Sequence, residues 1–131
     1  MQAQINNLSQ NKRLAKECLD TIFNQHNPAQ AVEKYIGANY RQHNPHAADE
    51  PEGVIEYATG YLKANPNLRL EFKRIIAEGD LVAVHSFLKP NSSDLGRAVV
   101  DIFRVQDGKL VEHWDVMQPI PLQAQNRNGM F

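Results

Sequence analysis

Apolar residues recur every three or four positions near the start of the chain, which is the spacing of an amphipathic helix. They form one stripe that comprises Leu14, Ala15, Cys18, Leu19, Ile22 and Phe23. Ser9 is a candidate N-cap for this helix, which we expect to end near His26. A short second helix is predicted after Asn27-Pro28, because a capping residue followed by proline is typical of a helix start, and Gly37 is expected to end it.

A third helical pattern begins near Pro51 and stops before Asn65-Pro66. Its apolar stripe comprises Val54, Tyr57, Ala58, Tyr61 and Leu62. The segment between the second and third helices, residues 39–51, lacks this periodicity, and we expect it to be irregular.

Apolar and polar residues alternate with the period of a β-strand in the second half of the chain. Residues 68–73 and 81–89 form two such strands with a turn at residues 78–80, and residues 97–119 form a hairpin. Helices grouped first and antiparallel strands grouped afterwards predict an α+β fold. We expect three N-terminal helices packed on a strongly curved, mainly antiparallel sheet, which gives a cone-shaped half-barrel with an internal pocket.

The final hairpin carries three ionisable residues inside apolar strands, Asp101, His113 and Asp115. Burial of an unpartnered carboxylate or imidazole is costly, so such side chains either satisfy one another or are kept for chemistry. A structural pair between Asp101 and His113 is therefore the alternative to a catalytic role for them.

The turn of the hairpin decides which side chains meet. A two-residue turn at residues 107–108 would set an apolar residue opposite each of His113 and Asp115. We favour a three-residue loop, residues 106–108, which sets Asp101 opposite His113 and gathers the polar side chains on one face. The other face then carries apolar residues, Val100, Ile102 and Trp114.

Composition narrows the classes of partner. The chain has 131 residues and a formal net charge of −1, which suits a single domain over 1–131 that is large enough to enclose a pocket. Nucleic acids and anionic membranes attract clustered Lys and Arg, and the absence of a basic run argues against both. Cys18 is the single cysteine, and the sequence shows neither a signal peptide nor an apolar run of ~20 residues, so we expect a cytoplasmic protein.

Several sequence features occur together with this order of elements. They are the segment Tyr40-x-x-His43-Asn44-Pro45, the hairpin sequence DIFRVQDGKLVEHWD and the final Gln118-Pro119. In these features the chain, from about Asn11 to Pro121, resembles the SnoaL-like polyketide cyclase family, which belongs to the nuclear transport factor 2-like superfamily. The resemblance implies a domain of that fold with a proton-transfer site that needs no cofactor.

The resemblance also implies roles for individual residues. Asp115 matches the aspartate that acts as general base in the cyclases, where it removes an acidic proton beside carbonyl groups and starts an aldol closure. His43 matches a supporting histidine, whereas Asp101 stands where the cyclases have a second histidine. His85 or His113 could supply the missing imidazole from a neighbouring strand.

The histidines also have structural alternatives. His85 could be a core histidine bonded to the backbone, and His43 could simply order its loop. His43 and His46 are three residues apart, but they bring neither a cysteine nor a third close ligand, so we expect no metal site.

Six side chains are predicted to contact a small-molecule ligand in the pocket: Tyr40, Tyr57, Tyr61, Phe87, Phe103 and Met117. Tyr57 and Tyr61 could instead be core or interface aromatics. The apolar outer face that includes Trp114 predicts a homodimer through the sheet, because such a patch is rarely left bare.

These features predict a cofactor-independent enzyme that acts on a small, largely apolar carbonyl compound by general acid-base catalysis. The reaction could be an aldol-type cyclisation, an isomerisation or a dehydration. A non-catalytic module that binds a small hydrophobic molecule, or a dimerising interaction domain of the same fold, is the alternative.

Overall fold

The computed structural model describes residues 2–131, with side chains from residue 7 onward. Within these residues it contains three helices and five strands. The helices are α1 (Gln2–Phe23), α2 (Pro28–Tyr35) and α3 (Pro51–Ala64), and the strands are β1 (Ile36–Gln42), β2 (Arg69–Glu78), β3 (Leu81–Lys89), β4 (Arg97–Gln106) and β5 (Lys109–Pro119). The predicted α+β class is confirmed.

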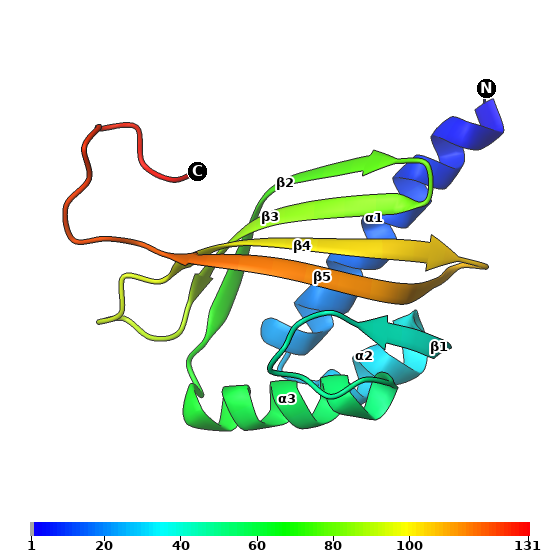
Figure 1. The fold of residues 1–131 in the computed structure, drawn as a ribbon, viewed down its shortest axis with the longest axis horizontal. Helices are drawn as coiled ribbons and strands as arrows, with labels where there is room; N and C mark the ends of the chain where they lie inside the picture. Colours follow the sequence, from blue (N-terminus) through cyan, green and yellow to red (C-terminus); the bar gives the residue numbers. More distant parts are fainter. Residues whose placement is uncertain (1) are drawn as a thin grey trace.

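The strands form one curved, unclosed sheet with the order β1-β5-β4-β3-β2. β1 runs parallel to β5, and the other neighbours are antiparallel. The helices lie against the concave face of this sheet (Figure 1). Six of the predicted core residues are buried there or pack against the core: Leu14, Leu19, Ile22, Phe23, Val54 and Ala58. Tyr57, which was also expected to face the core, is partly exposed.

The helix boundaries match the sequence in part. Asn27 caps α2 as predicted, because its Oδ1 accepts a hydrogen bond from the backbone N–H of Gln30 at 3.2 Å. Ser9 does not cap α1, because that helix already runs through it from Gln2. Gly37 does not end α2 either, since Ile36 has extended backbone angles and starts the next strand.

β1 is the one strand that the sequence pattern did not predict. It includes the start of the segment that was expected to be irregular, and it pairs Ile36 with Leu110 and Gln42 with His113. An edge strand with little apolar alternation gives a weak pattern, and Tyr40 is its only buried residue besides Ile36. This strand brings Gln42 to the final hairpin.

The register of the final hairpin differs from the prediction. Asp107 and Gly108 both have positive φ, 51° and 73°, and they form a two-residue turn instead of the predicted three-residue loop. Val111 is left without a partner as a β-bulge, which shifts the remaining pairs. Asp101 therefore lies opposite Asp115 rather than opposite His113.

The predicted faces of the hairpin are nevertheless confirmed. The turn and the bulge together move the pairing two residues from the predicted register, and a shift of two preserves the face of every side chain. Asp101 and His113 are buried on the concave side, whereas Val100, Ile102 and Trp114 are partly exposed on the outer side.

The residues after β5 fold back over the outer face of the sheet. They leave the end of β5 and turn back toward the sheet (Figure 1), and the ring of Phe131 lies 5.6 Å from the ring of His85 and 5.1 Å from that of Phe87. Val100 and Val116 line a groove beside this segment. None of the helices described by the structure combines the length and apolar character that crossing a membrane requires.

Candidate functional site

A cavity of about 60 Å³ lies between the helices and the concave face of the sheet. Its walls are mostly apolar, and its polar side chains are contributed mainly by β1, the loop that follows it, β4 and β5. The lining comprises Cys18, Leu19, Ile22, Phe23, Ile36, Tyr40, Gln42, Asn44, Val54, Tyr57, Ala58, Tyr61, Leu70, Leu88, Val99, Asp101, Phe103, His113, Asp115 and Met117. Such an arrangement suits a small apolar molecule with a polar group.

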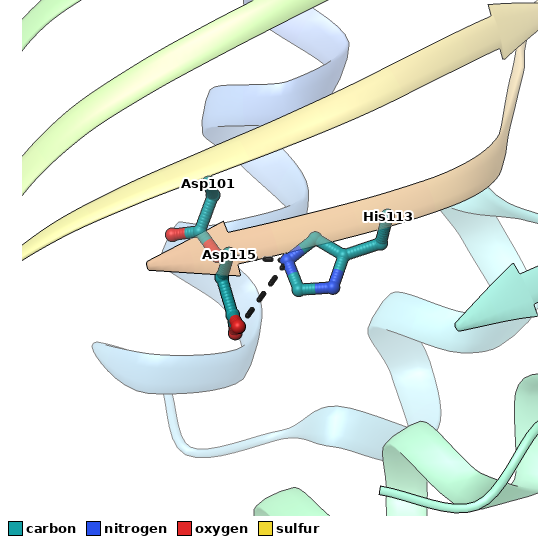
Figure 2. A group of neighbouring side chains, drawn as sticks. All are labelled: Asp101, His113 and Asp115. Atoms are coloured by element: carbon teal, nitrogen blue, oxygen red, sulfur yellow. Dashed lines mark hydrogen bonds and ion pairs between the residues drawn. The ribbon is translucent and has the colours of Figure 1, made fainter. Parts of the chain in front are cut away.

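Two carboxylates and one imidazole form the centre of the polar group (Figure 2). His113 Nε2 lies 2.8 Å from Asp101 Oδ1 and 4.0 Å from Asp115 Oδ2. About a tenth of each side chain is exposed. The bulge and the strand alternation described above place all three on the concave side, so a molecule in the cavity would meet this group.

Two amide side chains complete the group. Asn44 Nδ2 donates to Asp115 Oδ2 at 2.8 Å, and Asn44 Oδ1 accepts from the backbone N–H of His46 at 2.8 Å. Gln42 Oε1 accepts from the backbone N–H of Asn44 at 3.0 Å and lies 2.7 Å from His113 Nδ1. His113 and Asp115 are therefore each held by an amide side chain, whereas the hydrogen bond of Asp101 is the one to His113.

Burial controls the electrostatics of the cavity. It raises the pKa of the Asp115 carboxyl above its ordinary value; the nearby His113 and the hydrogen bond from Asn44 oppose this, and Asp101 adds to it by repulsion. Burial likewise raises the pKa of the Tyr57 phenol, so that this group keeps its proton near neutral pH. A basic carboxylate and a protonated phenol thus line the same cavity.

The structure brings together most of the predicted site. Asp101, His113 and Asp115 cluster as described, and five of the six predicted ligand contacts line the cavity: Tyr40, Tyr57, Tyr61, Phe103 and Met117. Phe87 does not, because it lies on the outer side of β3 between buried Ser86 and Leu88.

His43 lies outside the cavity, in contrast to the prediction. It follows Gln42 directly, and neighbouring residues of an extended chain point to opposite sides. Gln42 points inward, so His43 points outward, where its ring stacks on Trp114 at 4.9 Å and its Nε2 lies 2.8 Å from Glu112 Oε2.

His85 also lies outside the cavity. It alternates with the buried Val84 and Ser86 of β3 and therefore faces outward, beside Arg74 and Phe131. Partial burial and the positive charge of Arg74 lower the pKa of its imidazole. Neither His85 nor His43 can reach a molecule in the cavity as the chain is folded here.

Sequence reasoning overlooked two residues of the site, Gln42 and Asn44. Asn44 belongs to the segment that carried the family resemblance, so a signal for it was present. Nothing in the sequence pattern marked Gln42, because its importance depends on the unpredicted strand β1.

The clustered side chains are also those that could ligate a cation. One carboxylate or imidazole atom from each of Asp101, His113 and Asp115 lies within 4.8 Å of the other two. Carboxylate and imidazole are common metal ligands, so the expectation of a metal-free site stays a prediction.

The family model described as SnoaL-like polyketide cyclase matches residues 13–126. No curated protein sequence is significantly similar to the chain. Among solved structures, AclR of Streptomyces galilaeus, a proposed hydroxylase, is 27% identical, with a TM-score of 0.73 over 88% of this chain and 83% of that chain. A proposed polyketide cyclase from Bacillus cereus is 20% identical, with a TM-score of 0.72 over 82% and 74% of the two chains.

A proposed ketosteroid isomerase from Kribbella flavida is 17% identical to the chain, with a TM-score of 0.72 over 93% of this chain and 87% of that chain. At this identity the likeness concerns the fold alone. Together these structures confirm the cone-shaped fold of the nuclear transport factor 2-like superfamily that the sequence predicted.

Proposed function

Because the chain belongs to the SnoaL-like polyketide cyclase family, we propose that it is an enzyme that removes a proton from a small, largely apolar carbonyl compound without a cofactor. Cyclisation by aldol addition, isomerisation and dehydration can all begin with this step. The proposal therefore names the proton-removal step and the class of substrate, and it does not choose among the three reactions.

The observation that supports it best is the environment of Asp115. Its carboxyl lies at the cavity wall with a raised pKa and only 10% of the side chain exposed. A carboxylate removes a proton from carbon more readily when its basicity is raised toward that of the carbon acid. Asn44 holds the carboxyl by one oxygen, which leaves the other for the substrate.

The enolate that forms needs a hydrogen-bond donor at its oxygen. His43 and His85, the histidines that were expected to support the site, lie outside the cavity. We therefore assign this role to the Tyr57 phenol, which lines the cavity near Asp115. Asp101 and His113 adjust the charge around the base from the neighbouring position.

The experiment follows hydrogen–deuterium exchange at the carbon beside the carbonyl of small cyclic ketones and enones, by proton NMR in deuterium oxide. Asp115→Asn preserves the shape of the side chain but removes its basicity, and it should slow exchange roughly 100-fold or more. The matched control is Asp107→Asn in the exposed turn, where asparagine tolerates the positive φ.

Two results would contradict the proposal. Unchanged exchange in Asp115→Asn would show that another group is the base. If one of the ketones or enones binds in the cavity but the unmodified protein does not catalyse its hydrogen–deuterium exchange, a non-catalytic binding module is favoured instead.

We further propose that the protein forms a homodimer through the outer face of the sheet. Val116 is 68% exposed there, and Val100, Ile102 and Trp114 extend the apolar surface beside it. Apolar patches of this kind are commonly covered by a partner.

A further inference from the structure

The side-chain amide of Gln42 can adopt only one orientation. The backbone N–H of Asn44 can donate but cannot accept, so the Gln42 atom that it meets at 3.0 Å must be the oxygen Oε1. The amide nitrogen then donates to the hydroxyl of Tyr40 at 2.9 Å. A flipped amide would set two donors against each other at the Asn44 backbone.

This orientation fixes one proton on His113. The Nδ1 atom of His113 lies 2.7 Å from the same Gln42 oxygen, which can only accept. A hydrogen bond at this distance requires Nδ1 to carry its proton. The tautomer is therefore set by the main chain of β1 and its loop, through Gln42.

A second proton must lie between His113 and Asp101. With Nδ1 protonated, His113 Nε2 and Asp101 Oδ1 are 2.8 Å apart, and two lone pairs would repel at that distance. Either an imidazolium donates to the Asp101 carboxylate, or a neutral imidazole accepts from the Asp101 carboxylic acid. The pair has no net charge in either case.

We propose that Gln42 is a positioning residue that holds the proton of His113 on Nδ1 and thereby keeps the Asp101–His113 pair electrically neutral beside the base Asp115. The tautomer follows from geometry alone, and only its catalytic consequence rests on the proposed function. Asp101 lies directly opposite Asp115 across the two strands, so a net negative pair would repel the charge of the base.

The amide orientation of Asn44 is fixed in the same way, and it favours a different protonation state for Asp115 than the one described for Asp101. The backbone N–H of His46 fixes Asn44 Oδ1 as an acceptor, so Asn44 Nδ2 faces Asp115 as a donor. This bond favours the ionised carboxylate. One aspartate is thus arranged to share a proton and the other to receive one.

Other titratable and charged groups that face the pair and Asp115 must be included when a pH dependence is interpreted. They are Cys18 on α1, Tyr40 on β1, His46 on the loop after β1, Tyr57 on α3 and Arg97 on β4. Burial raises the pKa of the thiol and of both phenols, which therefore stay uncharged near neutrality.

The test reads the His113 tautomer directly from its ring nitrogens by two-dimensional proton–nitrogen NMR on the full chain. At pH 7 we expect Nδ1 to be protonated in the unmodified protein. Gln42→Leu removes the acceptor, and a buried N–H without a partner is costly. His113 should then become a neutral ring with its proton on Nε2, donated to the Asp101 carboxylate.

Gln42→Glu is the conservative variant, because a carboxylate still accepts from both Asn44 and His113, and it should keep the proton on Nδ1. Gln106→Leu, at the exposed end of β4, is the matched control and should leave the tautomer unchanged. An unprotonated Nδ1 in the unmodified protein, or a protonated one in Gln42→Leu, would overturn the proposal. If Gln42→Leu fails to fold, the unmodified protein and Gln42→Glu still decide it.

The catalytic consequence has a separate readout in the pH profile of exchange. In Gln42→Leu the pair carries a net negative charge, which repels the charged form of Asp115 and raises its pKa. The acidic limb of the profile should move to higher pH by about one unit, whereas a purely structural loss would lower the rate at every pH. If the unmodified protein shows the expected tautomer but catalyses no hydrogen–deuterium exchange, the proposed function is contradicted and the assignment of the tautomer stays intact.

Discussion

The two faces of the sheet hold their histidines in opposite ways. On the concave face, His113 is fixed at both ring nitrogens, by Gln42 and by Asp101, and about 10% of its side chain is exposed. On the outer face, His43 stacks on Trp114 and meets Glu112, and 45% of its side chain is exposed. Both pair with a carboxylate, so the pairing by itself does not indicate function.

The difference lies in what surrounds each pair. The His113 pair borders an apolar cavity, whereas the Glu112 carboxylate that meets His43 also binds the partly exposed Arg104, which in turn binds Asp80. Networks of ion pairs on the surface contribute little to the stability of the fold, and salt screens them. The comparison supports the proposals that place the chemistry on the concave face and the dimer contacts on the outer face.

The largest expected difference between the faces concerns stability. Leu19 on α1 is 2% exposed where that helix packs against the concave face. Leu19→Ala should lower the free energy of unfolding by ~2–5 kcal/mol. Ile76 is 62% exposed on β2, and Ile76→Ala should change it by less than about 0.5 kcal/mol. Urea denaturation measures both. Equal effects would mean that the helices do not cover the concave face as described.

The second expected difference concerns turnover. Asp115→Asn should slow exchange roughly 100-fold or more, whereas His85→Ala on the outer face should leave the rate within about twofold. If His85→Ala abolished exchange and Asp115→Asn did not, the base would lie on β3 and the assignment from the family would be wrong.

The sequence predicted the faces of the final hairpin better than its pairing. The alternation of apolar and polar residues predicted that Asp101, His113 and Asp115 lie on one side of the sheet. This prediction is correct although the predicted loop is wrong, because the bulge at Val111 offsets the one-residue difference in loop length. The direct pairing of Asp101 with Asp115 depended on that bulge, and bulges leave no clear mark in a pattern of period two.

The errors in the site follow from β1 and from alternation. The family resemblance gave His43 a role by its position in a segment, but that segment had no predicted strand from which its direction could be judged. Once Gln42 is known to point inward, His43 must point outward. The sequence did not decide whether His85 is a core histidine or a site histidine, because an apolar strand that is covered on both sides has no polar face to mark the outside.

The third difference concerns assembly. If the outer face forms a homodimer, Trp114→Glu should weaken it by roughly 30-fold, as the loss of a central interface tryptophan commonly does. Sedimentation at micromolar concentration measures the change, with Ile76→Glu at the far edge of the sheet as the control. A monomeric unmodified protein at that concentration would contradict the proposed dimer.

The smallest expected effect is a loss of stability with rising pH that arises from Asp115 on the concave face. The pKa of Asp115 in the folded chain is raised above the ordinary 3.8, so between these two values the folded state binds more protons than the unfolded state. The free energy of unfolding therefore contains a contribution that is complete below pH 3.8 and is lost as the pH rises through the raised value. Asp115→Asn should remove this loss and gain stability relative to the unmodified protein as the pH rises through that window. Asp107→Asn, in the exposed turn, should show no such gain when both are followed by urea denaturation from pH 3.5 to 7. If Asp115→Asn instead became relatively less stable toward neutral pH, the Asp115 carboxylate would be stabilised by its partners more than burial disfavours it, and its assignment as a base of raised basicity would fail.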